Sequence, residues 1–222
     1  MRLTRAAVQR RLAARLRAGA RDRGLTLIEL LVTITLLGII AVPLSAALIT
    51  YFQHTDDTTS RLSLSHDAQI SSSFFAQDVQ SMGTHNWGAT DFPLTRSVYT
   101  DGTKPYACGP ATPAALLRMS WDDPSKNKGG PVWQVVYFLK PVSGGLSELH
   151  RIVCTGSSAS QGPDVVLAHN VSKVVSLTCL NPTNCDTSTP PQTVTLVLEL
   201  KPQHSNVNDS LTVTLKGQRR QT

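Results

Sequence analysis

One stretch of the sequence constrains the fold more than any other. It is an almost uninterrupted apolar run from Leu25 to Thr50 that contains a single acid, Glu29. The 20 residues that follow the acid, 30–49, would form a helix about 30 Å long, which matches the hydrocarbon thickness of a membrane. A carboxylate in hydrocarbon is costly and is usually retained for a partner or a function. The run therefore predicts a membrane-spanning helix whose acid has a specific task.

Two residues inside this run affect the shape of the helix. Gly38 and Pro43 both lie within it. A proline cannot donate a backbone hydrogen bond, and its ring crowds the carbonyl four residues earlier. Membrane helices tolerate both residue types. We therefore expect the helix to continue through Gly38 and Pro43 with a bend.

The charge of the chain is concentrated before the apolar run. The formal net charge is +6, but residues 1–24 hold eight arginines and one acid, so they carry +7 and the remainder carries −1. The remainder has no basic patch with interleaved aromatic residues, so nucleic-acid binding is not expected. A basic segment before a span places the N-terminus in the cytoplasm. An ordinary secretory signal has a shorter apolar region, and a mitochondrial transit peptide is usually rich in serine, which this segment lacks.

All four cysteines follow the apolar run, in the part that an N-terminal anchor would export. Cys179 and Cys185 flank a short turn that a local disulfide can close, which leaves Cys108 to pair with Cys154. Two other connectivities are possible, and four reduced core cysteines are the alternative. A zinc site is disfavoured because no Cys-x2-Cys or paired-histidine spacing is present.

The chain after Tyr51 predicts a continuation of the same helix. No glycine or proline occurs until Gly83, and apolar residues recur at helical spacing along one face. We expect a single helix from about Leu25 to about Met82 whose second half packs on a globular domain. The predicted face consists of Leu64, Ala68, Phe75, Val79 and Met82, with Ser71 between them and Ile70 and Phe74 at its margin.

The rest of the chain predicts an antiparallel sheet. Residues 87–113 are irregular, with short strands at most. Seven β-branched runs with a period of two then follow, separated by turn residues. They are residues 116–120, 132–140, 148–154, 165–169, 171–180, 193–201 and 210–217. One face of the last pair should cover the helix, with Val194, Leu196, Leu198 and Leu200 on one strand and Leu211, Val213 and Leu215 on the other. The fold class is therefore α+β, with a long N-terminal transmembrane and amphipathic helix on an antiparallel sheet.

Polar clusters do not indicate an enzyme. His54 with Asp56 and Asp57, and His66 with Asp67, lie on what we interpret as an exposed polar helix face, and no Gly-x-Ser-x-Gly motif is present. A membrane-tethered hydrolase is the corresponding alternative.

The loop after residue 121 is a weak calcium candidate. It offers oxygen ligands from Asp122, Asp123 and Asn127. It lacks the closing glutamate of a calcium loop, so a plain turn is favoured and no metal or other cofactor is expected.

The tryptophans and one loop complete the set of candidate contact residues. We expect Trp133 in the core, and Trp87 and Trp121 in loops that contact other subunits. The loop at 156–164 is a further candidate for partner contacts.

Gly24 followed by LTLIELLVTITLLGIIA resembles the cleavage and N-methylation motif of type IV pilins and type II secretion pseudopilins. The resemblance implies that a prepilin peptidase cuts between Gly24 and Leu25 and that Leu25, where relatives usually have Phe or Met, is N-methylated. Thr26 takes the second mature position. Glu29 takes the acidic position, which pairs with the free amine of a neighbouring subunit during assembly.

The resemblance also implies an organisation and a function. It gives a leader at 1–24, a filament-core helix at 25–50, its amphipathic continuation at 51–83 and a head domain at 84–222, arranged as a pilin-like lollipop. The stretch SFFAQDVQSMG is similar to the helix end of PilW-like minor pilins and J-type pseudopilins.

The implied function is structural. The subunit would sit in the bacterial cytoplasmic membrane with an extracytoplasmic head, and would prime or decorate a pilus or a secretion or competence pseudopilus. Its partners would be other pilins, the peptidase, the inner-membrane assembly platform and the bilayer. The alternative is a signal-anchored adhesin or binding domain outside any filament.

Overall fold

The computed structural model describes residues 26–100, 102, 108–110, 114–122, 130–156, 160–202 and 210–220. Its helix α2 spans Leu27–Ser81, close to the predicted range of 25 to 82. The helix crosses the boundary between two compact units that meet between Gln53 and His54, and we describe each unit separately.

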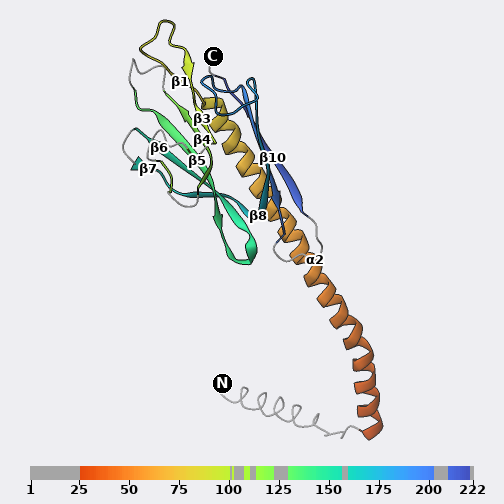
Figure 1. Ribbon diagram of the computed structural model, residues 1–222. Helices are drawn as coiled ribbons and strands as arrows, with labels where there is room; N and C mark the ends of the chain where they lie inside the picture. Colours follow the sequence, from red (N-terminus) through yellow and green to blue (C-terminus); the bar gives the residue numbers. More distant parts are fainter. Residues whose placement is uncertain are drawn as a thin grey trace, which may run out of the picture. The chain divides into compact units, whose positions relative to one another are not determined.

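In the second unit, the later part of α2 packs on one antiparallel sheet (Figure 1). The strand order is β10-β9-β8-β6-β5-β4-β3, with β7 paired to β6, and β1 and β2 form a separate two-stranded sheet. This arrangement confirms the predicted α+β fold class. The strands are β1 (Thr84–His85), β2 (Leu94–Thr95), β3 (Val98–Tyr99), β4 (Ala115–Trp121), β5 (Trp133–Pro141), β6 (Ser147–Thr155), β7 (Ser160–Gln161), β8 (Val165–Leu180), β9 (Thr193–Leu200) and β10 (Leu211–Gln218), and a 3-10 turn, η1 (Ser143–Gly145), joins β5 to β6.

Strand β8 joins the two halves of the sheet. Its first part, up to Val171, pairs with β6, and its second part, from Val171 on, pairs with β9. The prediction of two separate strands here was wrong. Asn170 takes a positive φ of 56°, which asparagine tolerates, and its carbonyl accepts a hydrogen bond from the Lys201 amide at 2.9 Å. The chain therefore stays in the sheet, and the shifts of register along β8 bend it.

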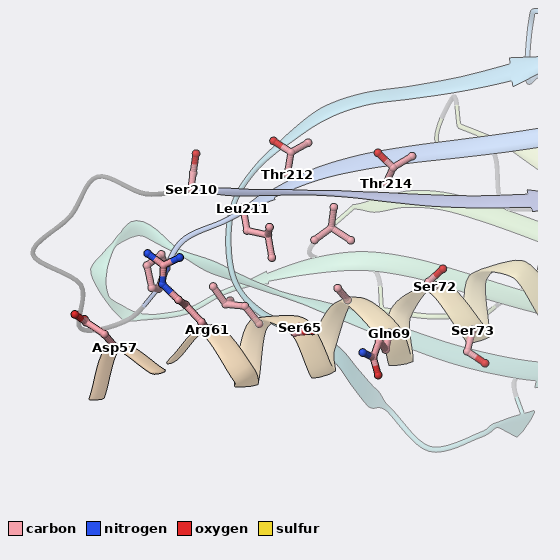
Figure 2. Close-up of a pocket in the computed structure, with 14 residues that line it drawn as sticks. Asp57, Arg61, Ser65, Gln69, Ser72, Ser73, Ser210, Leu211, Thr212 and Thr214 are labelled. Atoms are coloured by element: carbon pink, nitrogen blue, oxygen red, sulfur yellow. The ribbon is translucent and has the colours of Figure 1, made fainter. Parts of the chain in front are cut away.

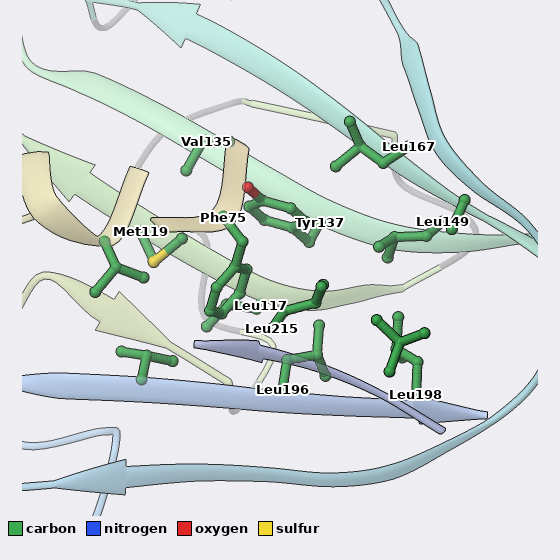
Figure 3. Close-up of a cluster of buried hydrophobic side chains, with 14 of the residues drawn as sticks. Phe75, Leu117, Met119, Val135, Tyr137, Leu149, Leu167, Leu196, Leu198 and Leu215 are labelled. Carbon is green, nitrogen blue, oxygen red and sulfur yellow. The ribbon is translucent and has the colours of Figure 1, made fainter. Parts of the chain in front are cut away.

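The main core lies between α2 and the sheet (Figure 3). The predicted helix face is confirmed at Leu64, Ser71, Phe75, Val79 and Met82, all of which are buried. Phe75 is fully buried and meets the ring of Tyr137 edge-on at a centroid distance of 5.5 Å. Side chains from β4, β5, β6, β9 and β10 surround it, including Leu117, Met119, Leu149, Leu196 and Leu215.

The alternation predicted for the last two strands is mostly confirmed. All four predicted residues of β9 are buried, as are Val213 and Leu215 of β10. Leu211 is the exception, because 41% of its surface is exposed. It lies at the first position of β10, beside Leu64 of α2 in a groove described below.

The helix and the sheet approach each other most closely at Gly217. This residue lies on β10, and a methyl group added to it would come within 2.4 Å of the Cβ of Val79. Val79 is fully buried. A side chain at position 217 would therefore push α2 away from the sheet.

A buried ion pair ties the end of α2 to the sheet. Asp78 is 3% exposed, and Arg151 of β6 donates two hydrogen bonds to its two carboxylate oxygens, at 2.6 and 2.7 Å. The Tyr137 hydroxyl of β5 donates a third at 2.5 Å. Burial and the neighbouring charge of Asp78 raise the pKa of Tyr137 well above its ordinary value, so the phenol keeps its proton and acts as a donor. The carboxylate is thus fully partnered.

A second carboxylate on α2 also faces the sheet. The interpretation of Asp67 as a surface residue was wrong, because only 7% of it is exposed. Its carboxylate accepts a hydrogen bond from the His169 amide at 2.8 Å and lies 3.0 Å from the Nδ1 of the same residue. Asp67 falls three residues after Leu64 and four before Ser71, so it shares the buried helix face. His66 and His54 are exposed, as expected.

Two disulfides close the second unit, with the predicted pairing. Cys179 is bonded to Cys185 at the end of β8. Cys108 is bonded to Cys154 of β6, 46 residues later. This second bond holds Cys108 against the face of the sheet that points away from α2, where a smaller cluster forms. The cluster contains Cys108, Val136, Phe138, Ile152 and Cys154.

The tryptophans lie near one end of β4 and β5. The prediction that Trp133 belongs to the core was wrong, because it is 38% exposed and stacks on its cross-strand neighbour Trp121 at 6.5 Å. The helix ends at Ser81, so no helical turn covers this end of the strands. Trp87 is half-buried and donates a hydrogen bond to Asp122.

We expect Gly217→Ala to destabilise the second unit by about 1–3 kcal/mol, because the added methyl group overpacks the helix–sheet contact at Val79. Thermal unfolding of the purified full chain, followed by circular dichroism, measures the change. Gly88→Ala is the matched control, because its added methyl group meets only the Asn86 side chain, at an ordinary 3.4 Å. Equal melting temperatures for the two variants would contradict the close approach.

We expect Arg151→Met to cost about 3–5 kcal/mol, because it leaves the buried Asp78 carboxylate without its bidentate partner. The triple variant Asp78→Leu, Tyr137→Phe and Arg151→Met should recover most of this loss, because it removes every buried polar group together. The control is Lys173→Met, whose ion pair with Glu199 is exposed at the lysine and should matter little. The same unfolding measurement applies, and a triple variant no more stable than Arg151→Met would refute this account.

Candidate functional site: the apolar helix segment and its N-terminal acid

The first part of α2 exposes apolar side chains around its whole circumference. The helix is long and apolar enough to cross a membrane, and none of its most apolar window is buried. Leu27 is 82% exposed, and Leu37 and Ile39 are each 70% exposed. A helix that is hydrophobic on all sides needs an apolar environment, either lipid or other helices.

The hydroxyl groups of this segment are satisfied within the helix. Thr35, Ser45 and Thr50 each donate to the carbonyl four residues earlier, at 2.8 to 3.0 Å. Thr33 donates to the Glu29 and Leu30 carbonyls. These groups therefore need no water, which allows the segment to enter hydrocarbon.

Thr26 and Glu29 form the start of the helix. The Glu29 amide donates to the Thr26 side-chain oxygen at 3.3 Å, and the Leu30 amide donates to the Thr26 carbonyl at 3.1 Å. Thr26 is thus the N-cap, and Glu29 occupies the third helical position, as in a capping box. The carboxylate also lies in the first turn, where the helix dipole favours a negative charge.

This local role of the two residues was not predicted, although the spacing Thr-x-x-Glu is its sequence signal. The side chain of Glu29 is exposed, and among the residues that the structure describes no hydrogen bond or ion pair to its carboxylate is found. The cap therefore uses the backbone of Glu29 and leaves its carboxylate available for another partner.

The processing residues themselves lie just before this cap. Gly24 and Leu25 are outside the described residues, so their cleavage stays a prediction. Gly38 and Pro43 lie within α2, which continues through both as one helix. A methyl group added at Gly38 would meet no atom within 4 Å, so packing inside the chain does not require a glycine there. The bend near Pro43 also stays a prediction.

Asp122 has a structural environment rather than an open metal-binding one. It is 4% exposed, and its carboxylate accepts hydrogen bonds from the His85 amide at 2.7 Å and the Trp87 indole at 2.9 Å. It also lies 2.8 Å from the His85 Nδ1. The other two calcium candidates, Asp123 and Asn127, are outside the described residues. Asp122 therefore anchors the chain that follows α2.

A groove of about 880 Å³ lies between α2 and β10 in the second unit (Figure 2). Leu64 and Ala68 of the helix and Leu211 and Val213 of the strand line it. Asp57 and Arg61 lie toward one end of the groove (Figure 2). Because β10 is the last strand in the order found among the described residues, the groove runs along a sheet edge. No local sequence pattern indicates this groove, because it joins residues about 150 positions apart.

Comparisons with known proteins concern the exposed apolar segment of α2 and the residues just before it. A family model described as the prokaryotic N-terminal methylation motif matches residues 19–45. No curated protein and no solved structure matches the chain. The matched range contains the predicted cleavage site, the Thr26 cap, Glu29 and most of the exposed apolar segment.

The matched motif and the fold are consistent with the same class of protein. The motif begins a long apolar helix, and the later part of that helix packs on a curled antiparallel sheet. The chain therefore combines an N-terminal methylation motif with a pilin-like α+β fold.

Proposed function

We propose that this chain is a minor pilin or pseudopilin, a structural subunit of a type IV pilus or of a secretion or competence pseudopilus. A prepilin peptidase removes residues 1–24, and Leu25 becomes the N-methylated first residue of the mature chain. The observation that carries the proposal is the exposed apolar segment of α2, which begins directly after the matched cleavage motif.

The exposed segment accounts for two successive locations. Before assembly, its apolar surface and internally bonded hydroxyl groups suit a lipid bilayer. In a filament, the same surface is buried against the equivalent helices of other subunits. Transfer from lipid to a helix bundle costs little because both environments are apolar. No catalytic step by this chain is required.

Charge and cysteine chemistry give the direction of insertion. The arginine-rich leader favours the cytoplasmic side of the membrane for the N-terminus. The two disulfides lie in the second unit and fit an oxidising compartment outside the cytoplasm. A single-pass protein of the cytoplasmic membrane with an extracytoplasmic head follows from both.

Glu29 supplies the specific contact of assembly. Its carboxylate lies among apolar side chains and has no partner in the described chain, whereas cleavage after Gly24 creates an α-amine. In the apolar filament core, the ammonium group of a neighbouring subunit would stabilise the carboxylate, because an unpaired charge there is costly. The inner-membrane assembly platform would deliver subunits to this contact.

The end of α2 supports a minor-pilin or J-type pseudopilin role over that of a plain anchored domain. In the stretch SFFAQDVQSMG, Asp78 binds the sheet through Arg151, and Gly83 takes a φ of 148° that favours glycine. The Gly83 amide then bonds the Ser120 carbonyl at 3.1 Å, which leads the chain into the sheet. These residues thus have defined structural tasks. A signal-anchored adhesin is the alternative, and cleavage distinguishes the two.

We expect the chain recovered from membranes of cells with a prepilin peptidase to begin at methylated Leu25. Gly24→Leu should abolish this start, because a bulky side chain replaces the glycine at the cleavage site. Intact-mass and N-terminal analysis measure both, with Gly19→Leu as the control that leaves the site unchanged. A wild-type chain that begins at Met1, or after Ala47, would contradict the filament-subunit proposal and favour the anchored alternative.

We expect Glu29→Leu to preserve cleavage and membrane insertion but to lower incorporation into filaments at least tenfold, because the neighbouring ammonium loses its partner. Immunoblots of sheared filaments against membrane fractions measure the ratio. Asp56→Asn is the control, because it removes an exposed acid farther along α2. If Glu29→Leu enters filaments as well as Asp56→Asn does, the acid has no role in assembly.

A further inference from the structure

The outer edge of β10 is open along part of its length. β10 is the last strand in the order found among the described residues, and β9 is its one strand partner there. The strand and α2 come closest at Gly217 and Val79. At the other end of the strand, residues 210–214 line the groove of about 880 Å³ between β10 and α2. The helix is thus close to the strand at one end and separated from it by the groove at the other.

The backbone hydrogen bonds show which residues of β10 face this edge. The Arg219 amide donates to the carbonyl of the residue before β9 at 2.8 Å, in the register that pairs the two strands. In an antiparallel ladder, alternate residues direct both backbone groups to the same side, so the even-numbered residues of β10 face away from β9. The Arg220 amide accordingly donates to the Gln80 carbonyl of α2 at 3.2 Å. Thr212 and Thr214 have the same orientation, and no partner for their backbone groups is found among the described residues.

Residues 210–214 lack the features that usually protect an edge strand. Natural edge strands tend to be short, bulged, or interrupted by lysine or proline, because open backbone groups pair with other chains. Strand β3, at the opposite end of the sheet, has two residues. Strand β10 has eight, and its register with β9 is uninterrupted. Residues 210–214, SLTVT, contain no charge, glycine or proline. An edge of this kind is typical of a strand that acquires a neighbour.

The groove beside this edge suits the side chains of an added strand. Leu211 points toward α2, whereas Thr212 and Thr214 point away from it (Figure 2). Leu211 is 41% exposed, and Leu64 and Ala68 of the helix line the same groove. A strand added to β10 would direct every second side chain to the same face of the sheet as Leu211. Apolar side chains at these alternate positions would therefore cover the exposed apolar surface of the groove.

The charge of the groove limits the chemistry of such a strand. Asp57 and Arg61 carry the charges among the described lining residues, and both lie toward one end (Figure 2). The other lining residues are apolar or carry a hydroxyl or amide group. A charge buried there would be unpaired, which is costly. The segment that pairs with residues 210–214 is therefore uncharged.

A second copy of this chain offers no matching strand among its described residues. Strands β1, β2, β3 and β7 have two residues each. All paired strands of the main sheet are antiparallel. Because α2 runs alongside β10, two β10 strands paired in this way would direct their α2 helices in opposite directions, which chains anchored in one membrane cannot adopt. This step rests on the membrane anchor of the proposed function. The added strand therefore comes from a different polypeptide.

We propose that the open edge of β10 binds an extended, uncharged segment of a partner polypeptide with apolar residues at alternate positions. The segment pairs with the backbone of Thr212 and Thr214 as an additional strand, and its apolar side chains enter the groove beside Leu64 and Leu211. The binding surface lies entirely in the second unit, so its test does not depend on cleavage after Gly24.

The probe is the peptide acetyl-Thr-Val-Thr-Leu-Thr-Val-Thr-amide, which is uncharged and alternates in polarity. The full chain is purified in detergent and titrated with the peptide, and amide hydrogen exchange is followed by mass spectrometry with electron-transfer fragmentation. We expect saturable binding of one peptide per chain and about tenfold slower exchange of the Thr212 and Thr214 amides. The fully N-methylated peptide is the matched control. It keeps the side chains but has no backbone donors, so it should not bind.

Variants assign the binding to the edge of β10. Thr212→Pro removes one amide that faces the edge and should weaken peptide binding about tenfold. Proline is tolerated at such a position because the lost amide does not pair with β9. Thr212→Val is the control, because it keeps the amide and should bind like the wild type. Leu211→Glu places a charge in the groove and should abolish binding, so it tests the surface even if Thr212→Pro does not fold.

Three results would overturn the proposal. The first is the absence of saturable peptide binding to the wild type, and the second is equal binding by the wild type and a folded Leu211→Glu. The third is slow exchange of the Thr212 and Thr214 amides in the chain without peptide. If this protection is independent of protein concentration, another segment of the same chain covers the edge, and if it appears only at high concentration, a second copy does.

Discussion

The head of this protein depends on the packing of the later part of α2 against a curled sheet. Phe75 and Val79 are fully buried there, and Gly217 has no side chain, so β10 can approach Val79 of the helix closely. The sheet can surround the helix because β8 bends where it passes from β6 to β9. Hydrophobic burial on this one face is the main source of stability of the unit.

Two carboxylates on the buried helix face determine how the helix sits on the sheet. Asp78 bonds Arg151 and Tyr137 on β6 and β5, and Asp67 bonds the backbone of β8. Apolar contacts tolerate small shifts, whereas bonded charges do not, because a shift would leave a buried charge unpaired. The two acids therefore select one rotation and one height of α2 along the sheet.

The apolar part of the same helix, in contrast, has no such specific contacts with the sheet. It is exposed around its circumference and satisfies its hydroxyl groups internally, and none of the described residues covers it. The Thr26 cap specifies where it begins. One continuous helix thus combines a segment that packs within the chain with an exposed apolar segment, which the proposed function assigns to lipid and other subunits. This division is what a filament subunit requires.

The sequence alone determined the features that depend on local spacing. These are the helix from 27 to 81, the strand runs, the processing motif and the short Cys179–Cys185 loop, because periodicity, turn residues and motif spacing are properties of neighbouring residues. The same spacing placed Asp67 on the buried face, but its polarity led to the opposite interpretation, since an acid is buried only where a distant partner exists.

Only the tertiary structure decided which distant residues meet. The pairing of Asp78 with Arg151, the bond of Asp67 to His169 and the contact of Gly217 with Val79 all join segments far apart in the chain. A local sequence pattern does not predict such contacts. They depend on strand order, register and the bend in β8, which are specified by the packing of the whole unit.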